Sequence, residues 1–251
     1  MVSDFPILEE EFMNRFRSDF IYMAPPFIAY YAAATNDLGT LQTAVDQCGL
    51  YRDILQSGAT ISGAWKHIVG SEDSDPGLWS TGNAWAAAGM TRVLATVMKA
   101  PVAQSNGAWK GQAIAELSQY IQEILGAAMQ APTQDGLLSN YWNEDDFGET
   151  SGTSLLAYVA YRMAVLRPEG LSQGQASDYV SWADKIRITL GGKDSQGNPH
   201  VTSTGVVTPA VNPYDSLSST PLTTGSPEGQ NFVVLMYAAW RDCVLAKICQ
   251  Q

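Results

Sequence analysis

The chain has 251 residues, of which 45% are hydrophobic and only 16% charged, and its formal net charge is -11. A chain of this length can bury a sizeable core, and we expect a single domain over residues 1–251. The excess of negative charge disfavours nucleic acid or an anionic membrane as a partner. No apolar run reaches the roughly 18 residues that a membrane-spanning helix needs.

The start of the chain, MVSDFPILEEEF, lacks the basic and apolar regions of a secretory signal peptide. The sequence by itself therefore predicts a cytoplasmic location by default. The chain has three cysteines, and an odd number does not form a complete disulfide framework. Cys243 and Cys249 can pair if the tail folds back, and three reduced thiols are the alternative.

Hydrophobic periodicity predicts helices along most of the chain. The predicted helices span residues 19–35, 37–56, 83–98, 109–130, 151–166, 176–190 and 228–248. Pro25 and Pro26 put the start of the first regular helix near residue 25, because proline is tolerated in a first turn and breaks a helix later. Asp37 has the side chain of an N-cap residue. Residues 191–226 form a long Gly/Ser/Thr/Pro-rich loop, in which VTSTGVV can pair as two short strands.

Helices that are apolar on most sides alternate with amphipathic ones, and each apolar helix opens with a polar, glycine-containing turn. The four turns read RSDFIYMAPP, WSTGNAW, FGETSGTS and TTGSPEGQ, and Arg92 and Arg162 each follow a turn glycine by ten residues. Such spacing indicates a repeat of helical hairpins. Buried inner helices with amphipathic outer partners predict an all-α fold, an α/α toroid whose turns gather around one pocket. An ordinary α-solenoid or bundle, with the same turns acting only as caps, is the alternative.

The elements SDFIYMAPPF, WKHIVG, GLWSTGNAW and FGETSGT, in that order, resemble the unsaturated rhamnogalacturonyl hydrolases. These are the YteR-like glycoside hydrolase family 105, and the sequence is most similar to the fungal branch. The resemblance implies an (α/α)6 six-hairpin barrel that is incomplete here, because the first match falls at Asp19. A missing sector would leave apolar faces exposed. We therefore expect a homodimer that closes the gap, or a helix over residues 4–17 that caps the open edge.

The resemblance also implies the chemistry of an unsaturated uronyl sugar at the end of a pectin fragment. Members of the family hydrate the C4=C5 enol ether rather than attack the anomeric carbon, and this needs a neutral carboxyl group as proton donor. Asp19 matches the family's general acid, and Phe20, Tyr22, Met23 and Phe27 are expected to exclude water from it. An ordinary N-cap aspartate is the alternative role of Asp19.

Several further residues match or adjoin binding positions of the family. The expected substrate-binding residues are Tyr22, Met23, His67, Trp79, Thr81, Asn83, Trp85, Glu149 and Glu228. Of the two tryptophans, we expect Trp79 to face the cavity and stack on a sugar ring, and Trp85 to pack in the core. Thr81 stands where the family has an arginine, which would grip the uronate carboxylate with its guanidinium fork.

Most glycosidases use two carboxylates. Glu149, Glu228 and either Asp145 or Asp146 are the candidates for a second one, although a carboxylate in a first helical turn has an ordinary structural role. The chain has no metal-ligand or phosphate-loop motif, so we expect no metal and no cofactor.

Three hypotheses about function follow. The first is a carbohydrate-active hydrolase with Asp19 as its acid. The second is a repurposed scaffold that acts as a cyclase, isomerase or lyase in fungal secondary metabolism, since Thr81 replaces the arginine. The third is a non-catalytic binding protein. The fungal relatives implied by the first hypothesis resemble secreted enzymes, whereas this sequence predicts a cytoplasmic location by default.

Overall fold

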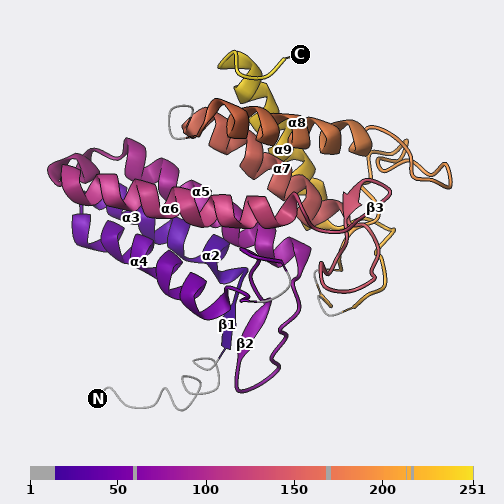
Figure 1. Cartoon of the computed structure of the whole chain (residues 1–251), viewed down its shortest axis with the longest axis horizontal. Helices are drawn as coiled ribbons and strands as arrows, with labels where there is room; N and C mark the ends of the chain where they lie inside the picture. Colours follow the sequence, from indigo (N-terminus) through magenta and orange to yellow (C-terminus); the bar gives the residue numbers. More distant parts are fainter. Residues whose placement is uncertain (1–14, 59–60, 168–170, 213, 216–217, 251) are drawn as a thin grey trace, which may run out of the picture.

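The computed structural model of the chain describes residues 15–58, 61–167, 171–212, 214–215 and 218–250, and they fold mainly into helices (Figure 1). The helices are α2 (Phe20–Met23), α3 (Pro25–Thr35), α4 (Leu38–Leu55), α5 (Ser80–Lys99), α6 (Gly107–Ala128), α7 (Thr150–Leu166), α8 (Gln173–Leu190) and α9 (Pro227–Leu245), with a 3-10 helix at Pro101–Ser105. The predicted helices are confirmed, with ends that differ by a few residues.

The helix starts follow from local capping. Asp37 caps α4 as predicted, since its side chain accepts a hydrogen bond from the Thr40 N–H at 3.2 Å. Asn106 caps α6 through the N–H of Trp109, so this helix begins two residues earlier than its apolar pattern. Ser172 caps α8 in a capping box, which again extends that helix beyond its apolar stretch.

The helices form an arc of hairpins with two layers. In the inner layer α3 packs on α5, α5 on α7, and α7 on α9; the outer helices α4, α6 and α8 pack on α3, α5 and α7 respectively. Figure 1 shows the direction of the helices turning gradually from α4 to α9. This alternation confirms the all-α arrangement of inner and outer helices that the sequence predicts.

Two of the four inner helices differ from the prediction that all are buried all round. Helices α5 and α7 are buried over most of their length, as expected. In contrast, Phe27, Tyr30 and Tyr31 of α3 are 69%, 48% and 55% exposed, and Val234 of α9 is 61% exposed. The expectation is wrong for α3 and α9 because, within the described residues, each has an inner neighbour on one side only.

Short strands tie down the loops. Strand β1 (Arg15–Arg17) pairs antiparallel with β2 (Ile68–Gly70), and β3 (Thr133–Gln134) pairs with β4 (Leu137–Leu138). Of the capping helix predicted over residues 4–17, residues 4–14 lie outside the described residues. The described part, Arg15–Arg17, is a strand, so the prediction is wrong there.

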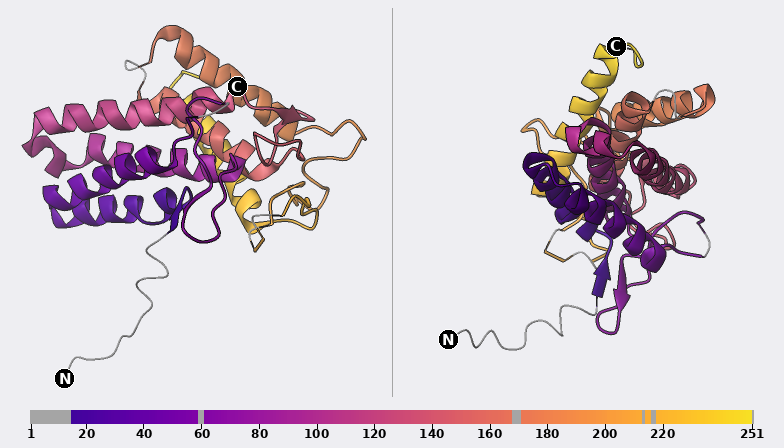
Figure 2. Two further views of the ribbon diagram at one scale, coloured as in Figure 1. Left: turned by 60° about the horizontal axis from the view of Figure 1, so that its bottom comes forward. Right: turned by 90° about the vertical axis from the view of Figure 1, so that its left-hand side faces the viewer.

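The loop from 191 to 226 packs on itself and lies beside β3 (Figure 2). Val207, Ala210 and His200 of this loop are buried, and single bridges join Val201 to Val207 and Ala210 to Leu222. The VTSTGVV segment thus forms one bridge rather than a strand pair. Cys243 and Cys249 form a disulfide, which is one of the two predicted alternatives. Cys48 is free and buried.

Candidate functional site

The amino-terminal turns of the inner helices meet at one end of the arc, and glycines allow their close approach. A Cβ atom at Gly152 of α7 would lie 2.6 Å from the Thr81 nitrogen of α5, and one at Gly82 would overlap the Ser18 Oγ just before α2. A Cβ atom at Gly229 of α9 would make a tighter than usual contact, 3.0 Å from the Ser151 Oγ of α7. Gly82 and Gly152 thus allow an approach that a side chain would prevent, and Gly229 eases the contact of α9 with α7.

Glu149 lies at the centre of this end, entirely buried, and caps α7. Its carboxylate accepts hydrogen bonds from the N–H groups of Ser151 and Gly152 at 2.5 and 2.7 Å, and from the Thr81 hydroxyl at 3.2 Å. Burial raises the pKa of Glu149 to about 7, against the opposing effect of these hydrogen bonds. Thr81 is itself fully buried. The residue at the family's arginine position therefore joins α5 to α7 and presents no side chain to solvent.

Asp19 and Glu228 form a pair of carboxyl groups on α2 and α9, at the same end. Asp19 occupies the N-cap position of α2 but makes no side-chain capping hydrogen bond; its Oδ1 lies 3.2 Å from the Arg17 Nε. Burial and the negative charge of Asp19 raise the pKa of Glu228 above its ordinary value. Two residues separated by more than 200 positions in the chain are thus close enough to interact electrostatically.

The apolar shell expected around Asp19 is only partly present. Phe20 stacks on Tyr51 with ring centroids 4.6 Å apart, and Tyr22 packs inward. Met23 and Phe27, in contrast, are 54% and 69% exposed and shield little. The Asp19 side chain retains 24% of its exposure, so water and a ligand can reach it.

His67 forms a buried network with two residues that sequence reasoning missed. Its Nδ1 lies 2.7 Å from the Asp75 Oδ2, which also accepts a hydrogen bond from the Tyr141 hydroxyl at 2.5 Å. Burial raises the pKa of Asp75, but the hydrogen bonds from His67, Tyr141 and one backbone N–H outweigh it and hold that pKa below its ordinary value. Because the carboxylate is an acceptor, Nδ1 donates its hydrogen to Asp75, and the buried Nε2 has no hydrogen-bond partner among the described residues.

The two tryptophans of the GLWSTGNAW segment are both nearly buried, at 4% and 7% exposure. Trp79 lies over the His67 imidazole, with ring centroids 4.4 Å apart, and its Nε1 donates to the Asn140 side chain. Trp85 packs edge-on against Tyr22 at 4.4 Å and against Phe232 at 4.6 Å. Trp85 therefore contacts α2, the helix that begins after Asp19, whereas Trp79 contacts His67 and Asn140.

Asn83, also expected to bind substrate, is buried and fully used by the backbone. Its Oδ1 accepts from the Trp65 N–H, and its Nδ2 donates to the carbonyls of Trp65 and Trp79. Asp146, a candidate second carboxylate, similarly holds its own loop through the Asn140 side chain and the Phe147 N–H. These side chains position the turns around the site.

Two carboxyl groups with different surroundings lie at this end of the arc. Asp19 has a cation beside it, whereas Glu228 has no ion pair in the part of the chain that the structure describes. Environments that differ in this way suit two carboxyls for different roles in one reaction. Within the described residues, no cluster of three or more His, Cys, Asp or Glu side chains could hold a metal ion, and no helix is long and apolar enough to cross a membrane.

The chain is similar to solved glycosidases over almost its whole length. A possible member of family GH105 from Salmonella enterica serovar Paratyphi A superimposes with a TM-score of 0.72 and 19% identity, covering 94% of this chain and 59% of that chain. A possible GH105 member from Klebsiella pneumoniae gives 0.72 and 18%, covering 93% and 58%. A glycosyl hydrolase family 88 protein from Bacteroides vulgatus gives 0.66 and 16%, covering 93% and 63%.

These similarities confirm the fold as an all-α toroid of the six-hairpin glycosidase type. The chain spans about three fifths of the length of these structures, between 58% and 63%. No curated protein is significantly similar in sequence. The model of Glycosyl Hydrolase Family 88 matches residues 9–177, which is more than half of the 251 residues. The chain therefore belongs to Glycosyl Hydrolase Family 88.

Proposed function

We propose that the chain is a hydrolase for a saccharide that ends in an unsaturated uronyl residue, as in the YteR-like enzymes and their fungal branch. A proton adds to C4 of the C4=C5 enol ether, and water adds to C5 to give a hemiketal. The hemiketal opens by breaking the C5–O5 bond, which gives a ketone at C5 and a hemiacetal at C1. The hemiacetal then breaks its C1–O bond to the rest of the saccharide, which leaves as an alcohol while C1 becomes an aldehyde. The protein has to supply one proton donor, one group that takes a proton from water, and a surface that binds the sugar.

The observation that carries this proposal is that Asp19, at the start of α2, and Glu228, in the first turn of α9, lie at the same glycine-rich end of the arc, where Asp19 keeps part of its exposure. Asp19, which matches the family's general acid, is the proposed proton donor. Glu228 is the proposed second carboxyl, which shares the proton with Asp19 and accepts one from water. Arg17, whose Nε lies 3.2 Å from the Asp19 Oδ1, stabilises the carboxylate that forms when Asp19 delivers its proton.

The other expected site residues divide by burial. Tyr22 and Met23, on the same short helix as Asp19, are the proposed sugar-binding surface, and the nearly buried Trp85 packs against Tyr22. The larger group lies beneath it and is proposed to hold the turns in place. This group comprises His67, Trp79, Thr81, Asn83 and Glu149.

The test uses pectin fragments produced by a lyase, whose terminal C4=C5 bond absorbs ultraviolet light. We expect the wild-type chain to abolish this absorbance, and Asp19→Asn and Glu228→Gln each to slow the loss by at least about 100-fold, the usual contribution of a general acid or base. Asp46→Asn, an exposed carboxylate on the outer helix α4, is the control and is expected to have no effect. An Asp19→Asn variant with wild-type rate, or a wild-type chain without activity from acidic to neutral pH, would contradict the proposal.

The burial of Thr81 favours a second candidate function. Because Thr81 contributes no charge to the pocket, a different small molecule could replace the acidic sugar, and the scaffold would act as a cyclase, isomerase or lyase in fungal secondary metabolism, or as a non-catalytic binding protein. The pectin-fragment assay separates these candidates: binding of a ligand without loss of the unsaturated bond would favour the second.

We further propose that a second copy of the chain covers the open edge as a homodimer. The two end helices of the arc expose apolar side chains, namely Phe27 and Tyr31 on α3 and Val234 on α9. Exposed apolar surface of this kind marks an interaction site. Light scattering at micromolar concentration is expected to give twice the chain mass, and a Phe27→Ser, Val234→Ser variant is expected to be a monomer. A monomeric wild-type chain would contradict the dimer.

A further inference from the structure

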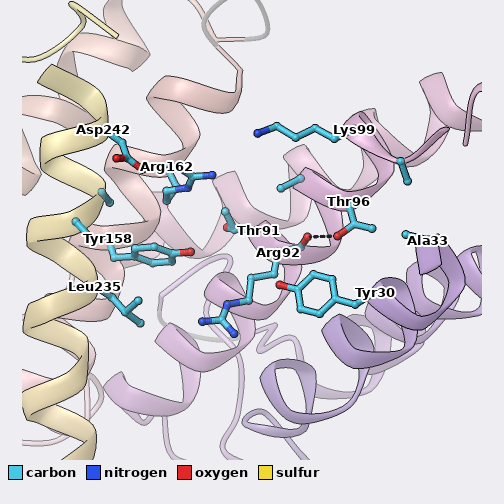
Figure 3. A pocket seen from close by; sticks show the side chains of 14 residues that line it. Tyr30, Ala33, Thr91, Arg92, Thr96, Lys99, Tyr158, Arg162, Leu235 and Asp242 are labelled. Carbon is cyan, nitrogen blue, oxygen red and sulfur yellow. Dashed lines mark hydrogen bonds and ion pairs between the residues drawn. The ribbon is translucent and has the colours of Figure 1, made fainter. Parts of the chain in front are cut away.

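A groove of about 710 Å³ lies between the inner helices α3, α5, α7 and α9, beyond the Asp19 end (Figure 3). This volume suits a ligand of one or two sugar rings. The side chains used below all line it: Tyr30, Arg92, Lys99, Tyr158, Arg162 and Asp242. The tyrosine hydroxyls of α3 and α7 point into the groove from opposite walls.

The groove is positively charged in a chain whose formal net charge is -11. Arg92, Lys99 and Arg162 face only one lining carboxylate, Asp242, which lies 3.5 Å from Arg162 and also accepts a hydrogen bond from Arg241 at 3.1 Å. Arg92 and Lys99 form no ion pair within the ranges that the structure describes. The groove therefore carries an excess of positive charge, which attracts an anionic ligand.

Arg92 is the cation that connects the groove to the candidate active site. It lies two turns after Trp85 on the same face of α5, and both contact Tyr22: the Arg92 guanidinium carbon is 4.1 Å from the centroid of the Tyr22 ring, and the Trp85 ring is 4.4 Å from it. The Tyr22 N–H in turn binds the Asp19 carbonyl at 3.0 Å. Lys99, at the end of α5, is about 10 Å further along the helix.

We infer that this groove binds the anionic part of a carboxylate-bearing saccharide, and that Arg92 binds the carboxylate. The inference rests on the proposed function for the part of the ligand at Asp19. A guanidinium donates two parallel hydrogen bonds to one carboxylate, and stacking on Tyr22 holds its plane in place. The hydroxyl groups of Tyr158 and Tyr30 form hydrogen bonds with the sugar hydroxyls. Arg162 and Lys99 attract the carboxylate of a second acidic sugar in an oligosaccharide.

Calorimetric titration with galacturonic acid, a digalacturonate and neutral galactose tests the inference without any need for turnover. We expect the wild-type chain to bind both acids more tightly than galactose, with digalacturonate tighter than the monomer. Arg92→Gln is expected to weaken binding of the acids at least tenfold and to leave galactose unchanged, and Arg92→Lys is expected to recover part of the affinity. Arg162→Gln is expected to weaken digalacturonate only. Lys185→Gln, which removes an exposed charge on the outer helix α8, is the matched control.

Four results would overturn the inference. They are wild-type binding that does not distinguish acid from galactose, equal binding of galactose phosphate, unchanged acid binding by a folded Arg92→Gln variant, and equal losses for acid and neutral sugar. If Arg92→Gln does not fold, Arg92→Lys and Lys99→Gln give the same comparison. An acid affinity that depends on Arg92 in a chain without hydrolysis would reject the proposed function alone, and hydrolysis with an acid affinity independent of Arg92 would reject this inference alone.

Discussion

The inner helices α7 and α9 both consist largely of apolar and small residues, yet their surroundings differ. In α7, 15 of 17 residues are buried, against 6 of 19 in α9. Helix α7 has α5 on one side, α9 on the other and α8 outside it, whereas α9 and α3 each end the arc. The closed region, α5 and α7, is held by backbone-to-backbone approach and buried polar contacts, whereas the end helices α3 and α9 present apolar side chains to solvent. The three cations of the groove lie on α5 and α7. The same kind of sequence is thus packed on both sides in one place and partly exposed in the other.

The largest expected effect comes from the closed region. A Cβ atom at Gly89 of α5 would overlap the backbone of Ile21 in α2, and no flexible side chain can yield there. We expect Gly89→Ala to lower the free energy of unfolding by about 3 kcal/mol or to prevent folding. Gly126→Ala on the outer helix α6, where a Cβ meets nothing within 4 Å, is expected to raise it by about 0.5–1 kcal/mol. Urea denaturation measures both, and equal effects of the two variants would refute this account of the closed region.

The buried carboxyl of Glu149 makes the closed region sensitive to pH. Burial raises its pKa from 4.5 to about 7, so between these values the folded state keeps a proton that the unfolded state releases. The free energy of unfolding therefore falls as pH rises through this window, by about 3 kcal/mol in all. Glu149→Gln is expected to remove this part of the pH dependence, and the exposed Glu144→Gln to leave it. Denaturation curves between about pH 4 and pH 8 measure this. If the free energy of unfolding of Glu149→Gln still fell over this range, Glu149 would not be the group responsible.

At the open edge, the Cys243–Cys249 disulfide ties the end of α9 to the tail. The two cysteines are six positions apart, so the disulfide closes a short loop and restricts the unfolded chain. We expect its reduction to lower the free energy of unfolding by about 2 kcal/mol. The measurement compares denaturation with and without a reductant, with Cys249→Ser as a variant that the reductant does not affect. No difference in the wild-type chain would mean that α9 does not depend on this link.

The smallest expected effect concerns the exposed apolar side chains. Phe27 is 69% exposed, so Phe27→Ser is expected to change the stability of a single chain by less than about 0.5 kcal/mol. Met163 of α7 is fully buried, and Met163→Ala, the reference for this comparison, is expected to lower the free energy of unfolding by about 2 kcal/mol. Thermal unfolding at low protein concentration measures the contrast. A large loss in Phe27→Ser at that concentration would mean that α3 is covered within one chain.

Much of the fold could be predicted because its signals are local. Apolar periodicity located all seven predicted helices, and the glycine-containing turns indicated that their starts meet. The starts of α6 and α8 differed because Asn106 and Ser172 cap those helices outside the apolar stretches. Strand β1 was missed because its pairing with β2 is some 50 residues distant in sequence, and three residues carry no periodicity.

The candidate site could be predicted only in part. Its polar residues were recognised in the turns, but their partners lie far away in the sequence. Tyr141 reaches Asp75 across 66 positions, and no spacing indicates that contact. The family resemblance likewise shows that Thr81 stands where an arginine is expected, but it does not show what Thr81 contacts. In the structure the Thr81 hydroxyl donates a hydrogen bond to Glu149.

The sequence by itself determined the alternation of inner and outer helices, the glycines that let the inner helices touch, and the candidate acids at their starts. Those properties depend on side-chain type and short spacing. Only the tertiary structure decided which apolar helices are covered, which carboxyls interact and where Arg92 lies. Burial and electrostatic interaction depend on neighbours in space, and an arc with two open ends gives otherwise similar helices different neighbours.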